Sequence, residues 1–202
     1  MVSTGSQPPR TSRARERGID AIAIVVAWSF AIAQPLLDLL GNNPAFFVAH
    51  SATTTDIALL GIGLVFIAPA ILAGLITLVS LVNASAGRWV HRIALAVLLA
   101  EFALQIEKHI GKVHGSIELI VALAAGGALS WAYDHRARWR SFAVWLSPAP
   151  IVFLALFLGA SPTSALVFPD DVTAADGMTI TTAQPVVILV LDELPVISIM
   201  DR

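Results

Sequence analysis

The stretch Asp56–Val82, DIALLGIGLVFIAPAILAGLITLVSLV, decides the fold class of this chain. After its first residue it contains no charged side chain. A helix needs about 20 consecutive apolar residues to cross the hydrocarbon core of a bilayer. The stretch is therefore predicted to span a membrane as a helix. Because it is longer than required and contains Pro69, we expect this helix to tilt or kink.

Four further apolar runs accompany it, namely Ile19–Leu40, Val90–Ile106, Ile117–Trp131 and Phe142–Ala160. The composition agrees, since 57% of the residues are hydrophobic and 13% are charged, against about 45–50% and 25% in soluble domains. The sequence thus predicts an α-helical integral membrane bundle of about five transmembrane helices over residues 19–160. Pro148 and Pro150 should break or bend the fifth span in mid-membrane, because proline lacks a backbone donor.

The first apolar run also has features of a secretory signal peptide. An arginine-rich segment precedes it, and Ala31-Ile32-Ala33 looks like a cleavage site. The run continues to Leu40, however, which is too long for a typical signal sequence. We therefore favour an uncleaved span, and cleavage would leave the orientation of the other spans unchanged.

The basic residues predict the orientation of the bundle. Nine of the twelve lysine and arginine residues lie in three segments that fall on one side of a five-span chain. These nine are Arg10, Arg13, Arg15, Arg17, Arg88, Arg92, Arg136, Arg138 and Arg140. The opposite loops hold only Lys108 and Lys112. The positive-inside rule then predicts a multi-pass protein of the cell membrane with a cytoplasmic N-terminus and an extracytoplasmic C-terminus.

The two ends of the chain differ from the bundle in composition. Residues 1–18 are polar and rich in Pro, Ser and Arg, which predicts a disordered cytoplasmic tail. Residues 161–184 are rich in Pro, Thr, Asp and Gly and read as an extracytoplasmic linker. The run that begins at Pro185 is β-branched and of strand length, typical of a buried strand in a parallel sheet.

A single buried strand requires partners on its edges and faces. We therefore expect residues 185–202 to be the start of an incomplete α/β domain that continues beyond Arg202, or to pack on another chain. The strand ends in Asp192, a carboxylate at the strand's carboxyl end, where ligands gather in open α/β sheets. By pattern alone such an Asp is also typical of a turn or of a helix N-cap.

The segment PVVILVLDELPVISIMD (Pro185–Asp201) resembles the opening strand of the sulfatase branch of the alkaline phosphatase superfamily. The order of several spans, an external linker and this strand is similar to bacterial membrane-anchored sulfatase-like hydrolases and transferases. The resemblance implies that Asp192 binds a divalent metal. Glu193 stands where soluble sulfatases commonly have a second Asp ligand. A metal cofactor is expected only when the downstream domain is present.

The nucleophile motif of that family, Cys/Ser-x-Pro-x-Arg, is expected after the strand and does not follow it within the chain. No catalytic residue is therefore assigned, and the chain alone is expected to be inactive. The leading hypothesis is the membrane-anchor region of a sulfatase-like metal-dependent hydrolase or transferase that acts outside the cytoplasm. The alternative is a small self-sufficient multi-pass membrane protein of structural or partner-binding type. Expected partners are the lipid bilayer and a lipid-linked or cell-envelope substrate, and no nucleic acid.

Polar residues inside the apolar runs form a second set of candidates. An intramembrane polar stripe recurs at helical spacing along the third span, at Glu101, Gln105 and Lys108. Outer polar positions occur in or at the start of three spans, at Gln34, Asp38, Asp56 and Glu118. At this depth such groups should face the bundle interior or a wet cavity. They are expected to hold the helices together by hydrogen bonds, or to form a polar mouth for a lipid-linked substrate.

The fourth span contains two adjacent glycines among alanines, Gly126 and Gly127. Small residues allow helices in a membrane to approach each other closely. We therefore expect this pair to mark a close contact between helices.

Overall fold

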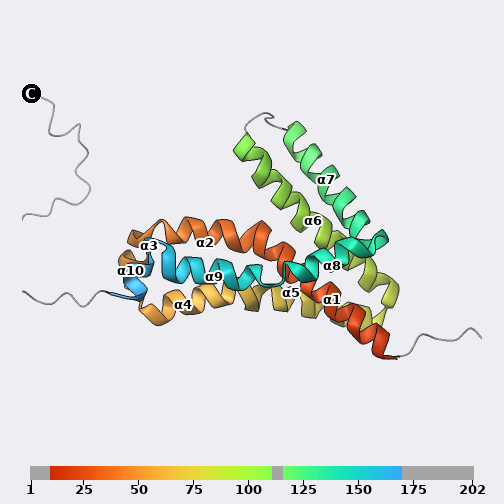
Figure 1. Cartoon of the computed structure of the whole chain (residues 1–202), viewed down its shortest axis with the longest axis horizontal. Coiled ribbons are helices and arrows are strands. Elements are labelled where there is room, and N and C mark those ends of the chain that lie inside the picture. Colours follow the sequence, from red (N-terminus) through yellow and green to blue (C-terminus); the bar gives the residue numbers. More distant parts are fainter. Residues whose placement is uncertain (1–9, 111–115, 170–202) are drawn as a thin grey trace, which may run out of the picture. The chain divides into compact units, whose positions relative to one another are not determined.

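The computed structural model describes residues 10–110 and 116–169, and these form helices and turns without a strand. Five helical segments are long and apolar enough to cross a membrane, as the sequence predicts. These spans are Arg15–Gly41, Thr54–Val82, Ala84–Lys108, Ser116–His135 and Ala137–Ala160. Figure 1 shows their elements: α1 (Arg10–Trp28), α2 (Gln34–Gly41), α3 (Pro44–Ala49), α4 (Thr54–Ile62), α5 (Ala68–Val82), α6 (Ala84–Ile110), α7 (Ser116–His135), α8 (Ala137–Trp145), α9 (Ala149–Ala160) and α10 (Ser164–Val167).

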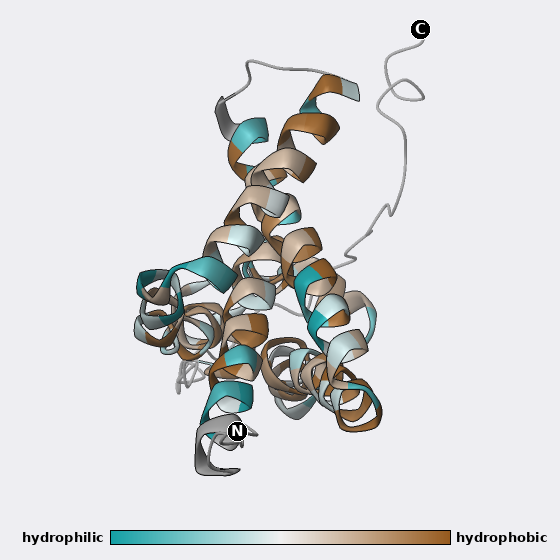
Figure 2. Ribbon diagram, turned by 90° about the vertical axis from the view of Figure 1, so that its right-hand side faces the viewer, coloured by the Kyte–Doolittle hydropathy of each residue, from teal (hydrophilic) through white to brown (hydrophobic). Residues whose placement is uncertain are grey.

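The first helix begins earlier than the apolar run. α1 starts at Arg10, so the prediction of a disordered tail is wrong for residues 10–18, which are helical. Alanine, arginine and glutamate are good helix formers, and a helix can continue into water past the membrane surface. The hydrophilic start of α1 is visible in teal beside the N-terminal end in Figure 2, and hydrophobic residues follow it.

Two π-helical turns interrupt the first and second spans, each ending two residues before a proline. The turn Ser29–Ala33 precedes Pro35, and the turn Gly63–Ile67 precedes Pro69. A proline removes one backbone donor, and its ring clashes with the carbonyl four residues earlier. A widened turn relieves that clash. The irregularity expected at Pro69 thus takes the form of a π turn, and the same device occurs at Pro35.

The fifth span is broken, as its prolines predict. α8 ends at Trp145 and α9 begins at Ala149. Pro148 and Pro150 lie at the start of α9, where proline is tolerated because the first helical N–H groups have no intrahelical partner. The break divides the span into two short helices near its middle.

Two apolar clusters form the interior of the bundle. The first joins all five spans, and we call it the five-span cluster: Ala23, Ile24, Ala27, Ala31, Ile76, Leu95, Leu98 and Tyr133, with Ala143 of α8 packed against it. The second joins the first, second and fifth spans with α3 and α10, and we call it the three-span cluster: Ala33, Leu37, Phe47, Ile57, Val65, Phe157 and Val167. Among the described residues, α6 and α7 contribute nothing to the second cluster.

Large apolar side chains cover the outside of every span. Ile93, Ile120 and Ile151, for example, are each about 60% exposed (59%, 64% and 61%). Such a surface would be unfavourable in water but suits a bilayer, where lipid tails replace the solvent. The distribution of apolar residues therefore agrees with a membrane-embedded bundle.

The first residues of the predicted linker are folded. Residues 161–169 form a turn and the short helix α10, which packs on α9 and α4. Thr163 is fully buried, and its hydroxyl donates to the carbonyls of Leu40 and Gly41, at 3.0 Å each. Thr54 donates to the carbonyl of Leu166 at 3.2 Å. This segment is therefore docked on the ends of the first two spans, and the remainder of the predicted linker lies outside the described residues.

Candidate functional sites

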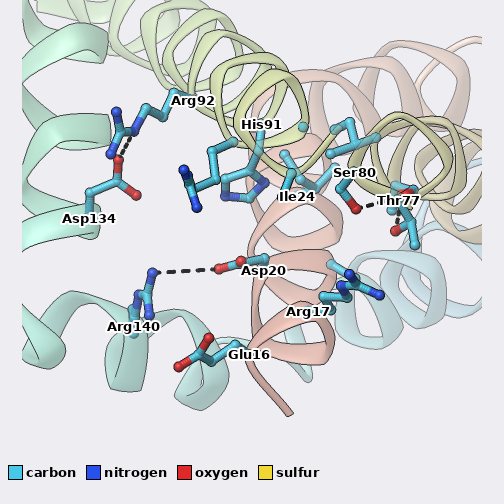
Figure 3. Close-up of a pocket in the computed structure, with 16 residues that line it drawn as sticks. Glu16, Arg17, Asp20, Ile24, Thr77, Ser80, His91, Arg92, Asp134 and Arg140 are labelled. Carbon is cyan, nitrogen blue, oxygen red and sulfur yellow. Dashed lines mark hydrogen bonds and ion pairs between the residues drawn. The ribbon is translucent and has the colours of Figure 1, made fainter. Parts of the chain in front are cut away.

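A polar pocket of about 280 Å³ lies where the basic ends of all five spans meet. Each span contributes to its wall, through Asp20 of α1, Thr77 of α5, His91 of α6, Asp134 of α7 and Arg140 of α8. Figure 3 shows these side chains converging on one space. We call it the basic-end pocket, because four arginines line it: Arg17, Arg88, Arg92 and Arg140.

Charged side chains link separate spans across this pocket. Arg92 of α6 pairs through its Nε atom with the carboxylate of Asp134 on α7. Asp20 of α1 accepts a hydrogen bond from the Tyr133 hydroxyl at 3.0 Å and lies 4.0 Å from a terminal nitrogen of Arg140. Both carboxylates therefore face cations or donors from other spans. This is the arrangement that ionised groups require at membrane depth.

Two donors or acceptors in the pocket wall have no partner among the described residues. His91 is 8% exposed and its Nε2 atom makes no hydrogen bond. The Nε atom of Arg140 is likewise buried and unpaired, although its guanidinium group lies over the Tyr133 ring at 5.4 Å. A buried polar atom without a partner costs about 1–3 kcal/mol. The pocket thus retains unused capacity for hydrogen bonding.

Sequence reasoning did not identify the basic-end pocket. The sequence pattern indicates Arg92 and Arg140 only as topology signals and assigns no role to Asp20 or Asp134. One signal was available: two carboxylates lie within a few residues of the predicted membrane surface on the arginine-rich side. Opposite charges at one depth on neighbouring spans are expected to pair.

A second cavity, of about 330 Å³, lies at the opposite end of the bundle between α2 and α9. Gln34 and Asp38 line it together with Asn42, Phe153 and Phe157. Asn42 donates its side-chain amide to the Asp38 carboxylate at 3.1 Å. Two of the four outer polar positions predicted from the sequence therefore share one cavity, here called the opposite-end cavity.

The other two outer positions lie elsewhere. Asp56 forms a capping box at the start of α4, where its carboxylate accepts from the backbone N–H of Thr53 at 2.9 Å. Glu118 lies in the first turn of α7, and its Oε1 atom is buried without a hydrogen-bond partner in the described part of the chain. Neither residue belongs to the lining of the opposite-end cavity. Asp56 has a local structural role that fully accounts for its position.

The predicted polar stripe on the third span is divided between two faces of α6. Gln105 is half-buried and donates to the carbonyl of Ala31 in the π turn of the first span. That carbonyl lies four residues before Pro35, which has no N–H to offer it. Gln105 therefore holds two spans together by a hydrogen bond, one of the two roles expected for the stripe.

The expectation that Glu101 faces the bundle interior is wrong, because its side chain is exposed. Ile93 and Val97 precede it by two turns and one turn and are 59% and 55% exposed. Glu101 continues this outer stripe, and Lys108, two turns further on, is exposed as well. The face toward the first span is occupied instead by residues such as Leu98 and Gln105.

A polar side chain also joins the first and second spans close to their π turns. Trp28 donates its indole N–H to the carbonyl of Leu64 at 3.0 Å. Leu64 lies five residues before Pro69, so in the π register its usual backbone donor is missing. The indole supplies the donor that proline lacks.

Of the predicted glycine pair, Gly126 alone makes the close contact. A Cβ atom at Gly126 would lie 2.7 Å from the Ala100 Cβ and closer still to the Ala96 carbonyl oxygen. The same atom at Gly127 would meet nothing within 4 Å. α6 and α7 therefore approach each other closely along the Gly126 face, and Figure 1 shows the two helices side by side.

The metal site implied by Asp192 and Glu193 lies outside the described residues. Within residues 10–110 and 116–169, no group of three or more His, Asp or Glu side chains is placed to hold a metal ion. Comparison with known proteins found no matching family model, no matching curated protein and no matching solved structure. The described residues therefore define a helical protein with five helices that are long and apolar enough to cross a membrane.

Proposed function

We propose that the chain is the membrane-anchor region of a sulfatase-like, metal-dependent hydrolase or transferase that acts outside the cytoplasm. The proposal is supported by the five candidate spans of residues 10–110 and 116–169, an odd number, combined with basic residues gathered at one end. If that end is cytoplasmic, as the positive-inside rule predicts, everything after Ala160 lies on the exterior. The resemblance of Pro185–Asp201 to a sulfatase strand supplies the class of chemistry.

The opposite-end cavity supports a role beyond anchoring. Ser161 and Pro162, where the fifth span ends, line it together with Gln34 and Asp38. In the proposed orientation this cavity, which has both apolar and polar lining residues, opens beside the point at which the chain leaves the membrane. A lipid-linked substrate would then meet polar groups directly below the external segment. Asp38 and Gln34 are the residues that would contact it.

Reporter fusions test the topology on which the proposal rests. Fusions after Gly18, Ala86 and Arg138 should report the cytoplasm, and fusions after Asn43 and Ala174 should report the exterior. A cytoplasmic signal from the Ala174 fusion would remove the odd-span arrangement, and with it any external hydrolase.

The gene sequence after Arg202 tests the chemistry. A reading frame that continues with a Ser- or Cys-x-Pro-x-Arg motif supports the hydrolase. In the continued protein, Asp192→Asn should then weaken metal binding, while Asp201→Asn serves as a control for the loss of one carboxylate in the same segment. A stop codon after Arg202, with the Ala174 fusion still external, supports the self-sufficient structural or partner-binding protein instead.

A further inference from the structure

We propose that the basic-end pocket binds a phosphate-bearing anion, supplied by a phospholipid headgroup or by a soluble phosphate ester. The proposal rests on the contacts in the pocket and does not depend on the sulfatase-like resemblance. The basic-end pocket has a volume of about 280 Å³, close to the lower end of the volumes of small-molecule sites, about 300 Å³. The space suits a headgroup-sized ligand.

The charge of the wall favours an anion. Among the described side chains, four guanidinium groups and three carboxylates line the pocket, which leaves one positive charge before His91 is considered. Asp134 is paired with Arg92, and Asp20 accepts from Tyr133 and faces Arg140. The third carboxylate, Glu16, is exposed. Arg17 and Arg88 have no ion pair within the described residues, so their charges are available to a ligand.

The unpaired atoms indicate which chemistry a ligand of this pocket needs. The Nε atom of an arginine carries a proton and can only donate, so the buried Nε of Arg140 requires an acceptor. His91, which is more than nine-tenths buried in the same wall, has an unpaired Nε2 that can donate as well. Phosphate oxygens accept several hydrogen bonds from such groups at once. A metal cation would leave Arg140 unsatisfied and would be repelled by the guanidinium groups.

The location of the pocket matches a phosphate source. It lies at the arginine-rich ends of the spans and includes Ala84 and Gly87 from the first turn of α6, the positive end of that helix dipole. In the proposed orientation this is the depth of the cytoplasmic headgroups. Basic pockets between helices on that side bind anionic headgroups in other membrane proteins.

Binding is tested on the full chain purified in detergent. Inorganic phosphate should raise the melting temperature of the protein in a saturable way, because a ligand that binds only the folded state stabilises it. Sodium chloride at the same ionic strength should not reproduce the effect. In a parallel experiment the protein is reconstituted in nanodiscs of phosphatidylglycerol and phosphatidylcholine in equal amounts. Native mass spectrometry after extraction then shows which lipid is retained.

Three variants locate the site. His91→Phe keeps a ring beside Tyr133 but removes the donor, so the unliganded variant should be at least as stable as the native protein while its phosphate affinity falls about tenfold or more. Arg88→Gln changes an exposed, unpaired side chain of the wall and should also weaken binding. Arg138→Gln removes the same charge from an exposed residue outside the pocket wall and should leave binding unchanged.

The outcomes separate the two sources. A phosphate response without lipid retention assigns a soluble phosphate ester. Retention of phosphatidylglycerol that is lost in His91→Phe assigns a headgroup. The proposal is overturned if the native protein shows neither effect, if His91→Phe and Arg88→Gln bind normally, or if Arg138→Gln loses binding to the same extent as Arg88→Gln.

Discussion

The two ends of the bundle satisfy their polar groups in different ways. At the basic end, charged side chains from separate spans pair with one another, as Arg92 does with Asp134. At the opposite end, neutral hydroxyls bond to backbone carbonyls, as Thr163 does with those of Leu40 and Gly41. The five-span cluster lies toward the basic end of the bundle, and the three-span cluster lies at the opposite end.

The difference shows how each end is held. Ion pairs act over several ångströms and weaken where water and salt reach them. Hydrogen bonds from buried hydroxyls to helix-end carbonyls are short and directional, and each contributes about 0.5–1.5 kcal/mol to stability. We therefore expect the stability of the basic end to depend on ionic strength. The stability of the opposite end should depend on individual hydrogen-bonding groups.

The largest effect is expected at the contact between α6 and α7. Gly126→Ala should lower the unfolding free energy by about 3 kcal/mol, since an added methyl group must displace backbone atoms of α6. Gly127→Ala is the matched control and should be neutral, because nothing lies within 4 Å of its Cβ position. Thermal unfolding in detergent measures both. Equal melting temperatures for the two variants would contradict the close approach.

The opposite end should depend on one hydroxyl. Thr163→Val keeps the shape of the buried side chain but removes one donor from each of two carbonyls, which keep the backbone N–H groups of Asn43 and residue 163 as donors, so the loss should be about 1.5 kcal/mol. Hydrogen exchange should quicken in α2, α9 and α10 and stay unchanged in α6 and α7. Thr53→Val is a useful comparison, because it removes an exposed helix cap at the same end. Uniform acceleration through all five spans would show that the two ends do not behave separately.

The hydrogen bond from Trp28, just before the first π turn, to Leu64 of the second should contribute less to stability. Trp28→Phe retains an aromatic ring but removes the donor to the Leu64 carbonyl, for an expected loss of about 1 kcal/mol. Trp131→Phe, at an exposed position on α7, controls for the change of ring. Unfolding followed by circular dichroism compares them. Identical unfolding of the two variants would mean that another group satisfies Leu64.

The ion pair at the basic end should contribute about 0.5–1 kcal/mol, because the Arg92 side chain is 41% exposed and therefore screened. In a double-mutant cycle of Arg92→Gln and Asp134→Asn, the coupling energy should fall as salt is raised. Thr163→Val measured over the same salt range should lose a constant amount. A salt-independent coupling energy would place this pair in a drier environment than its exposure indicates.

No loss of stability is expected on substitution of Glu101. Because its side chain lies on the outer stripe of α6, Glu101→Leu should not reduce stability and removes a carboxylate that costs about 2.5–3.5 kcal/mol at mid-membrane depth on insertion scales. Gln105→Leu, one turn away, should destabilise the bundle by removing the bond to Ala31. A destabilised Glu101→Leu variant would restore the interior role that the sequence predicts.

The features that the sequence predicted correctly are those that depend on local properties of the chain. Long apolar runs define the five spans, and Pro148 breaks the fifth because a proline acts on its own helix. The bond expected of Gln105 was also found, although its partner was not foreseen. Asp192 and the strand before it remain predictions.

The features that were missed depend on how each helix is rotated about its axis. α6 carries apolar residues around its whole circumference, so its pattern does not indicate which side faces the protein. Glu101 was assigned to the wrong face for this reason. Gly126 and Gly127 look alike in sequence and differ only in what lies opposite them. To predict the basic-end pocket, the rotation of all five spans about their axes would have to be known.

The hydrogen bonds at the two prolines imply an order of biogenesis. Spans leave the ribosome in chain order, so the Leu64 carbonyl can meet Trp28 as soon as the first hairpin is inserted. The Ala31 carbonyl must wait for Gln105 of the third span. Thr163 arrives last and fastens the end of the fifth span to the end of the first. A nascent chain arrested after two spans should therefore expose an unsatisfied carbonyl to lipid and be a preferred target for insertion chaperones and membrane proteases.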